Sequence, residues 1–237
     1  PESSYPMERE LFLDFTTEDL TINNPPEWME AAPTNGTRIA MPPNAETVEI
    51  SASEVALWAT DQHGWHLECI GTNGWNITHE IGTAPILHRG PDREGEVLCA
   101  AVDGYGKTSE DNRTWYGAVP FEWNASLNDD QHVLVEVTPE TSTGYSLSAN
   151  LVQGERTTGN IAMTVTGPTV FDHSTQGLRP GGLVWEYRLT GGGWLASDAR
   201  INLGLELPNT PPTLTLTRGL DGSNGTMNAL GTSIIVA

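Results

Sequence analysis

Six residues with metal-ligating side chains fall within one short window of the sequence. They are His63, His66, Cys69, His79, His88 and Cys99. Imidazole nitrogens and thiolate sulfurs are typical zinc ligands in proteins. The spacing argues against such a site, because positions 63 and 66 point to opposite faces of a strand and no second close pair completes a four-ligand set. We therefore predict no metal site, and histidines that form hydrogen bonds on a polar sheet face.

Cys69 and Cys99 are the only two cysteines, and each lies inside a strand-like run. Two cysteines do not make a disulfide scaffold. They could form one disulfide across two strands, or they could be two small buried side chains. The sequence leaves both alternatives open.

Motifs for nucleophilic or phosphate chemistry are absent from the sequence. It contains no Gly-x-Ser-x-Gly, no Gly-x-x-x-x-Gly-Lys and no Gly-x-Gly-x-x-Gly that opens a helix. Acidic residues are so abundant that carboxylates pair by chance, and the segment 103–106 has the composition of a turn. The three glycines 191–193 are better explained as a hairpin connection than as a phosphate site. We therefore expect no enzymatic activity and no cofactor.

Aromatic residues are concentrated in the first half of the chain. Five tryptophans stand out, with Tyr105 and Tyr116 nearby: Trp58, Trp65, Trp75, Trp115 and Trp123. Flat rings of this kind can stack on sugars, but tryptophan also dominates protein cores and the centres of interfaces. We take the five tryptophans as candidate subunit contacts.

Short apolar or alternating runs separated by glycine, proline, asparagine and aspartate dominate the sequence, which is typical of β-strands. The predicted strands are 11–15, 37–41, 47–50, 64–70, 97–102, 114–121, 132–138, 146–152, 160–166, 182–189, 200–207, 213–218 and 233–236. Residues 51–60 fit a helix almost as well as a strand. The apolar residues of 133–137 and 203–207 alternate with polar ones, as in a sheet with one buried face. We predict an all-β protein, a jelly roll, β-barrel or sandwich.

The chain changes character near residues 127–130. Tryptophans, histidines and both cysteines concentrate before this point, whereas threonine, glycine and leucine dominate after it. We predict a β-barrel or sandwich unit over 1–127 and a second, smaller β unit over 128–237, or the completing half of one barrel. Residues 1–6 and 23–35 are candidate extended arms.

The charge of the chain is unusual. Lys107 is the only lysine, beside ten arginines and 31 acidic residues, and the formal net charge is −20. At about 1 M salt, repulsion between like charges is screened within roughly 3 Å, and carboxylates keep a surface soluble. The composition therefore predicts a protein that works in concentrated salt. The lack of a basic stripe argues against direct binding to nucleic acid or to an anionic membrane surface.

In length, acidity, scarcity of lysine and double β organisation, the chain resembles the larger major capsid protein of halophilic archaeal icosahedral viruses with an internal membrane. The resemblance implies a structural subunit of an icosahedral shell, with upright jelly rolls in the lattice. It implies self-association, pairing with a second capsid protein, and contact with an underlying membrane vesicle without insertion. The N-terminus shows no export signal, so we expect assembly in the host cytoplasm and a final location in the virion.

The alternative function is a carbohydrate-binding or adhesive β-sandwich on a cell or virion surface, which requires exposed tryptophans. A hydrolase ranks third, because it would need two carboxylates that converge at about 5–9.5 Å.

Overall fold

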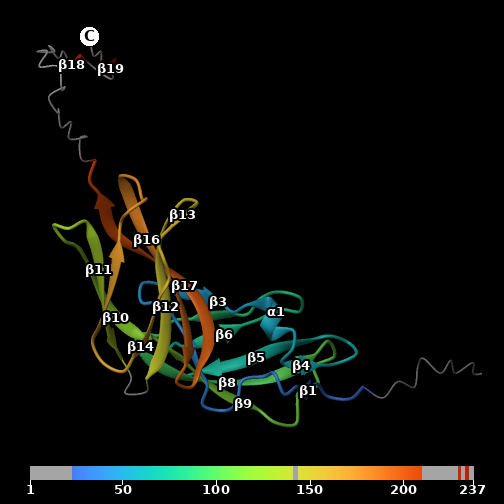
Figure 1. Cartoon of the computed structure of the whole chain (residues 1–237). Coiled ribbons are helices and arrows are strands. Elements are labelled where there is room, and N and C mark those ends of the chain that lie inside the picture. Colours follow the sequence, from blue (N-terminus) through green and yellow to red (C-terminus); the bar gives the residue numbers. More distant parts are fainter. Residues whose placement is uncertain (1–22, 141–143, 210–228, 231–232, 235–237) are drawn as a thin grey trace, which may run out of the picture.

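The computed structural model describes residues 23–140, 144–209, 229–230 and 233–234. The described chain is almost entirely β-structure, which confirms the predicted all-β class. Two β-sandwich lobes lie at an angle to each other and share one long sheet (Figure 1). Each lobe has its own hydrophobic core. No helix in the described part of the chain is long and apolar enough to cross a membrane.

The long sheet has nine strands and runs through both lobes. In spatial order its strands are β13 (Arg156–Thr157), β12 (Tyr145–Gln153), β16 (Gly181–Gly191), β17 (Trp194–Leu207), β2 (Arg38–Ala40), β9 (Arg113–Ala118), β8 (Glu94–Asp103) and β5 (Trp65–Gly71), and β14 (Ile161–Val165) also pairs with β12. Only β2 pairs in parallel, with β17 on one side and β9 on the other. β9 belongs to the first lobe and β17 to the second. Because β2 pairs with both strands, it joins the two lobes.

Two three-stranded sheets pack against the long sheet, one in each lobe. In the first lobe these strands are β3 (Thr47–Glu49), β7 (Ile86–His88) and β6 (Asn76–Thr78), and in the second they are β10 (Phe121–Leu127), β11 (His132–Pro139) and β15 (Thr169–Ser174). Outside these sheets lie α1 (Ala52–Val55) and two short pairs, β1 (Glu27–Trp28) with β4 (Ala59–Thr60) and β18 (Ala229–Leu230) with β19 (Ser233–Ile234). The segment 51–60, left open from the sequence, thus forms a short helix followed by a strand.

The predicted alternation is confirmed in the second lobe. Val133, Val135 and Val137 of β11 are fully buried, and they face the apolar side chains of β12 and β16. Leu203 and Leu207 of β17 enter the same core. The glycines 191–193 connect β16 to β17 as a hairpin, also as predicted.

The predicted strand over 114–121 is wrong, because the structure divides it between two lobes. β9 ends at Ala118 and β10 begins at Phe121, with Pro120 between them. Proline has no N–H for a sheet ladder, and here its carbonyl accepts hydrogen bonds from the Tyr145 hydroxyl (3.0 Å) and the Glu140 N–H (3.1 Å). The chain therefore passes from the first lobe to the second at residues 118–121. The division predicted at 127/128 lies within the second lobe instead, in the turn between β10 and β11.

Several strands are not apparent in the sequence because they are short or mixed in polarity, such as β6, β7 and β15. The predicted strands 11–15 and 213–218 and the predicted arm 1–6 lie outside the described residues. The predicted arm 23–35 packs on its own lobe, where the Trp28 indole N–H donates to the Asp111 carbonyl at 2.7 Å. It therefore does not extend as an arm.

Trp75 sets the packing of the first lobe. It is buried, and its indole N–H donates to the carbonyl of Asp92 at 3.1 Å. Its ring occupies the space where Gly95 of β8 and Gly117 of β9 would carry a Cβ atom, and these two glycines are direct partners across the two strands. Any larger residue at either position would overlap the indole.

Replacing Gly117 with alanine should lower the free energy of unfolding by about 1–3 kcal/mol, because the new methyl group would overfill the core. Chemical denaturation in concentrated salt measures the change. Gly182→Ala is the matched control, since the same atom added there in β16 meets nothing within 4 Å. Equal stability of the two variants would contradict this account of Trp75.

Candidate functional site

Three of the five candidate contact tryptophans are core residues. The exposed fractions of Trp58, Trp75 and Trp115 are 1%, 1% and 0%. Trp115 packs edge-on against Trp58, with ring centroids 5.2 Å apart, and donates from its indole N–H to the carbonyl of Pro33 at 3.2 Å. Their assignment to subunit contacts is therefore corrected, because a side chain buried within its own chain offers no surface to a partner.

The other two candidates, Trp65 and Trp123, are partly buried, and their place at subunit contacts stays a prediction. Trp65 packs edge-on against His79, with ring centroids 5.7 Å apart. Trp123 packs against the core of the second lobe. Each of the eight tryptophans in the sequence is buried or partly buried.

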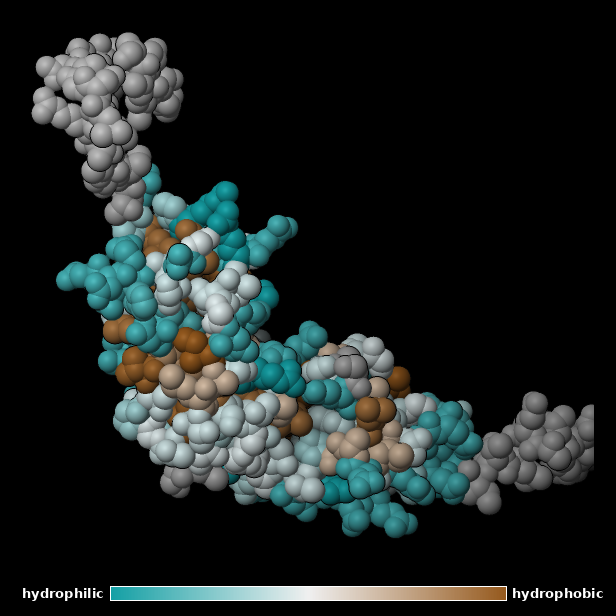
Figure 2. Space-filling view, in the orientation of Figure 1, coloured by the Kyte–Doolittle hydropathy of each residue, from teal (hydrophilic) through white to brown (hydrophobic). Residues whose placement is uncertain are grey.

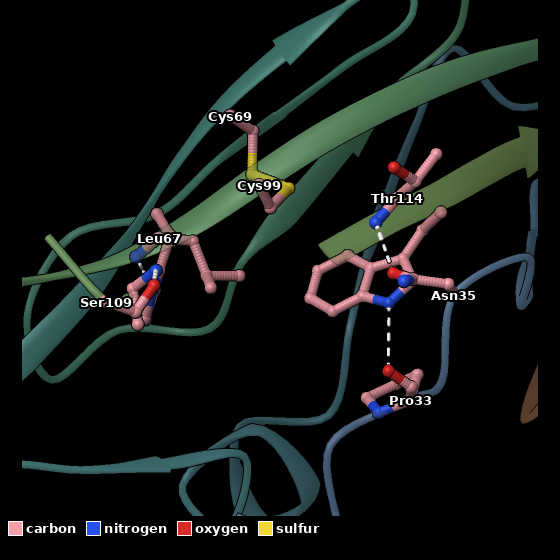
Figure 3. The surroundings of a disulfide bond; sticks show 10 residues. Pro33, Asn35, Leu67, Cys69, Cys99, Ser109 and Thr114 are labelled. Atoms are coloured by element: carbon pink, nitrogen blue, oxygen red, sulfur yellow. Dashed lines mark hydrogen bonds between the residues drawn. A yellow bond between two sulfur atoms is a disulfide. The ribbon is translucent and has the colours of Figure 1, made fainter. Parts of the chain in front are cut away.

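Cys69 and Cys99 form a disulfide between neighbouring strands (Figure 3). They are direct partners in the β5–β8 register, with Cα atoms 4.1 Å apart. The sequence left open whether the two thiols pair, and the register settles it by bringing them together. The bond holds β5, which is the last strand of the long sheet, to its only partner in that sheet.

An exposed apolar pair lies next to the disulfide on the opposite face of the same two strands. Ile70 is 78% exposed and Leu98 is 40% exposed, and they are also direct partners in the register. We call them the Ile70–Leu98 patch. Of the large hydrophobic side chains exposed in the described residues, all but Val170 lie in the first lobe: Met29, Leu57, Ile70, Ile81, Ile86, Leu98 and Tyr105. Most of the surface around the hydrophobic areas is hydrophilic (Figure 2).

A groove of about 660 Å³ borders this patch and is lined by residues of β5, β6 and β8. His79 is one of its lining residues. Its Nδ1 accepts a hydrogen bond from the Leu67 N–H at 2.9 Å, and its Nε2 lies 3.1 Å from the carbonyl of Thr83, to which it donates in this tautomer. Burial lowers the pKa of His79, assisted by the nearby His66 and opposed by the bond to Thr83. At the free edge of β5, a neutral imidazole thus accepts the Leu67 N–H that a neighbouring strand would otherwise accept.

The histidines and cysteines of the first lobe do not gather into the zinc set that their types suggested. Both cysteines are consumed by the disulfide, and His88 bonds to Thr78 through Nε2 at 2.8 Å. Within the described ranges, one group of three metal-ligating side chains does come together, namely Asp61, His63 and Asp103. The sequence separates Asp103 from the other two by about 40 residues, so only the strand register reveals the group.

A buried histidine also lies in the second core. His173 is 1% exposed, and its Nε2 accepts a hydrogen bond of 2.9 Å from the indole N–H of Trp185. Burial lowers the pKa of His173 from 6.5 to about 4, although the nearby Asp172 opposes the shift. Protonation would remove the acceptor that Trp185 uses, so the neutral form is the one compatible with this core.

Comparisons with known proteins assign the chain to no family. No known family and no curated protein matches the sequence. Among solved structures, the chain is similar to the YadV chaperone (12% identity, TM-score 0.26, covering 70% of this chain and 98% of that one). It is also similar to dimeric latent PorU from Porphyromonas gingivalis (9% identity, TM-score 0.27, covering 78% of this chain but only 20% of that one). Likenesses this low carry no argument about function, and the class defined here is an all-β protein of sandwich type.

Removing the disulfide with the double substitution Cys69→Ala and Cys99→Ala should lower the free energy of unfolding by about 3–4 kcal/mol. The reason is that the unfolded chain loses a cross-link that closes a loop of 30 residues. Denaturant titration with and without a reductant measures the effect. The reductant should destabilise the wild type and leave the double variant unchanged, and equal responses would contradict a structural disulfide.

Stability should fall as the pH drops from about 6.5 to about 4, because the unfolded chain then binds a proton at His173 that the folded chain excludes. The loss from this residue is about 3 kcal/mol at the low end. His173→Gln keeps an acceptor for Trp185 but cannot titrate. Subtracting its pH–stability curve from that of the wild type removes the contribution of the carboxylates. A difference that does not change with pH would contradict the lowered pKa of His173.

Proposed function

We propose that the chain is a structural subunit of a symmetric protein shell that is stable in concentrated salt, specifically the capsid of a halophilic archaeal virus. It associates with further copies of itself and with a second capsid protein around a membrane vesicle. The composition carries this proposal, because a net charge of −20 with a single lysine suits a surface whose charges are screened by salt. The expectation that the chain is not an enzyme remains part of the proposal.

The first lobe offers a surface for such contacts. The Ile70–Leu98 patch is apolar, and the strands that carry it are held together by the Cys69–Cys99 bond. Exposed hydrophobic side chains on an otherwise acidic chain favour contact with another protein surface. Disulfides persist in oxidising surroundings, which is consistent with a particle released from its host. We assign the patch to the contact with a neighbouring copy of the chain.

The alternative of a glycan-binding sandwich is less well supported. It requires flat aromatic rings open to solvent, yet each tryptophan is at least partly buried. Tyr105 is the large aromatic side chain most open to solvent among the described residues, at 74%. A single ring gives a poor platform for a sugar chain, so this function stays second.

Light scattering of the full chain tests the proposal. At about 1 M salt the wild type should form a large assembly that dissociates near 0.1 M, where acidic repulsion is no longer screened. Ile70→Glu should reduce assembly at high salt, because it places a charge in an apolar contact. Val170→Glu is the matched control, since it makes the same change on the second lobe, and it should assemble like the wild type.

Each result points to a different conclusion. A wild type that stays monomeric at both salt concentrations would overturn the shell proposal. A wild type that assembles together with an Ile70→Glu variant that assembles equally well would keep the shell proposal but overturn the role of the patch.

A further inference from the structure

Two turns meet at the end of the first lobe because of the β5–β8 register. Trp65 at the start of β5 is the direct partner of Asp103 at the end of β8. The chain entering β5 through Asp61 and His63 therefore lies beside the chain leaving β8 at Asp103. One carboxylate oxygen from each aspartate and one ring nitrogen of His63 lie within 4.8 Å of one another.

The two carboxylates are buried. Asp103 is 1% exposed, and the side chain of Asp61 is 4% exposed. Burying an ionised carboxylate is costly unless it is paired with a charge or bound to a metal, and two close carboxylates add mutual repulsion. The arrangement therefore calls for a positive charge between them.

One oxygen of each aspartate is used by the backbone of its own turn. Asp61 Oδ1 accepts the His63 N–H at 2.7 Å. Asp103 Oδ1 accepts the N–H groups of Tyr105 and Lys107, both at 2.8 Å. These bonds fix the direction of both carboxyl groups and leave the second oxygen of Asp103 for another partner.

Two polar atoms of this group are buried without a hydrogen-bond partner. They are Oδ2 of Asp103 and Nδ1 of His63. His63 Nδ1 is 3.6 Å from Asp61 Oδ1, which is too long for a hydrogen bond. Unpartnered buried polar atoms are rare in proteins, so two within one group of three side chains favour a ligand that binds there.

The lysine beside these turns does not supply this charge. Lys107 is the only lysine, and it donates to the backbone carbonyl of Asn23.

We propose that Asp61, His63 and Asp103 bind one divalent first-row transition-metal ion. Two carboxylate oxygens and an imidazole suit Zn²⁺ or Mn²⁺ better than Ca²⁺ or Mg²⁺, which prefer oxygen ligands alone. Donor atoms that all lie within 4.8 Å of one another fit ligands placed about 2.0–2.6 Å from one ion. The ion ties the turn before β5 to the turn after β8.

The test uses Zn²⁺ as the probe with the oxidised full chain, so that the cysteines cannot bind it. After dialysis against Zn²⁺ and then buffer, elemental analysis should find about one equivalent per chain, and added Zn²⁺ should raise the melting temperature relative to EDTA. Asp103→Asn keeps an oxygen for the two turn N–H groups but loses the negative charge. This variant and His63→Gln should each weaken Zn²⁺ binding at least about tenfold.

His66→Gln is the matched control, because it removes a nearby histidine that is outside the group. It should bind Zn²⁺ like the wild type. Circular dichroism at high salt verifies that each variant is folded. If His63→Gln does not fold, Asp103→Asn alone tests the site. A wild type without stoichiometric Zn²⁺ would overturn the proposal. Equal losses in His66→Gln and His63→Gln would also overturn it.

Discussion

The indole of Trp75 lies where two glycines on neighbouring strands leave room for it, and the first lobe is organised around this contact. Gly95 and Gly117 face each other across β8 and β9, so their missing side chains form one continuous recess. Trp75 belongs to the segment between β5 and β6 and carries that segment into the recess. The position of the small sheet against the long sheet, and with it the groove beside β5, depends on this contact.

Backbone pairing and ion pairs both join the two lobes. β2 pairs in parallel with a strand of each lobe, and its contact with β17 is a single residue pair, Arg38 with Trp194. Arg93 of the first lobe forms ion pairs with Glu122 and Glu140 of the second. The side chains of Arg93 and Glu122 are more than half exposed, so salt weakens this pair, whereas apolar burial does not suffer from screening. In concentrated salt the backbone and the apolar contacts must therefore set the angle between the lobes.

The sequence predicted the parts of the fold that follow from local patterns. The alternation of Val133, Val135 and Val137 and the glycine hairpin after β16 need only neighbouring residues, and both are confirmed. The role of Trp75 could not be predicted, because the glycines around it are distant in sequence and become neighbours only in the folded sheet. The group of Asp61, His63 and Asp103 could not be predicted for the same reason, since no short motif contains it. Strand register, which decides both, is not encoded in a single run of residues.

Three features of the first lobe act on one strand. β5 is the last strand of the long sheet, and a free edge exposes backbone groups that can pair with other chains. The disulfide fastens its middle to β8, His79 occupies the Leu67 N–H, and the proposed ion fastens its beginning. A strand held at several points can present Ile70 to a partner through its side chain without offering its backbone. This favours contacts of defined geometry over open-ended strand addition, as the proposed closed shell would require.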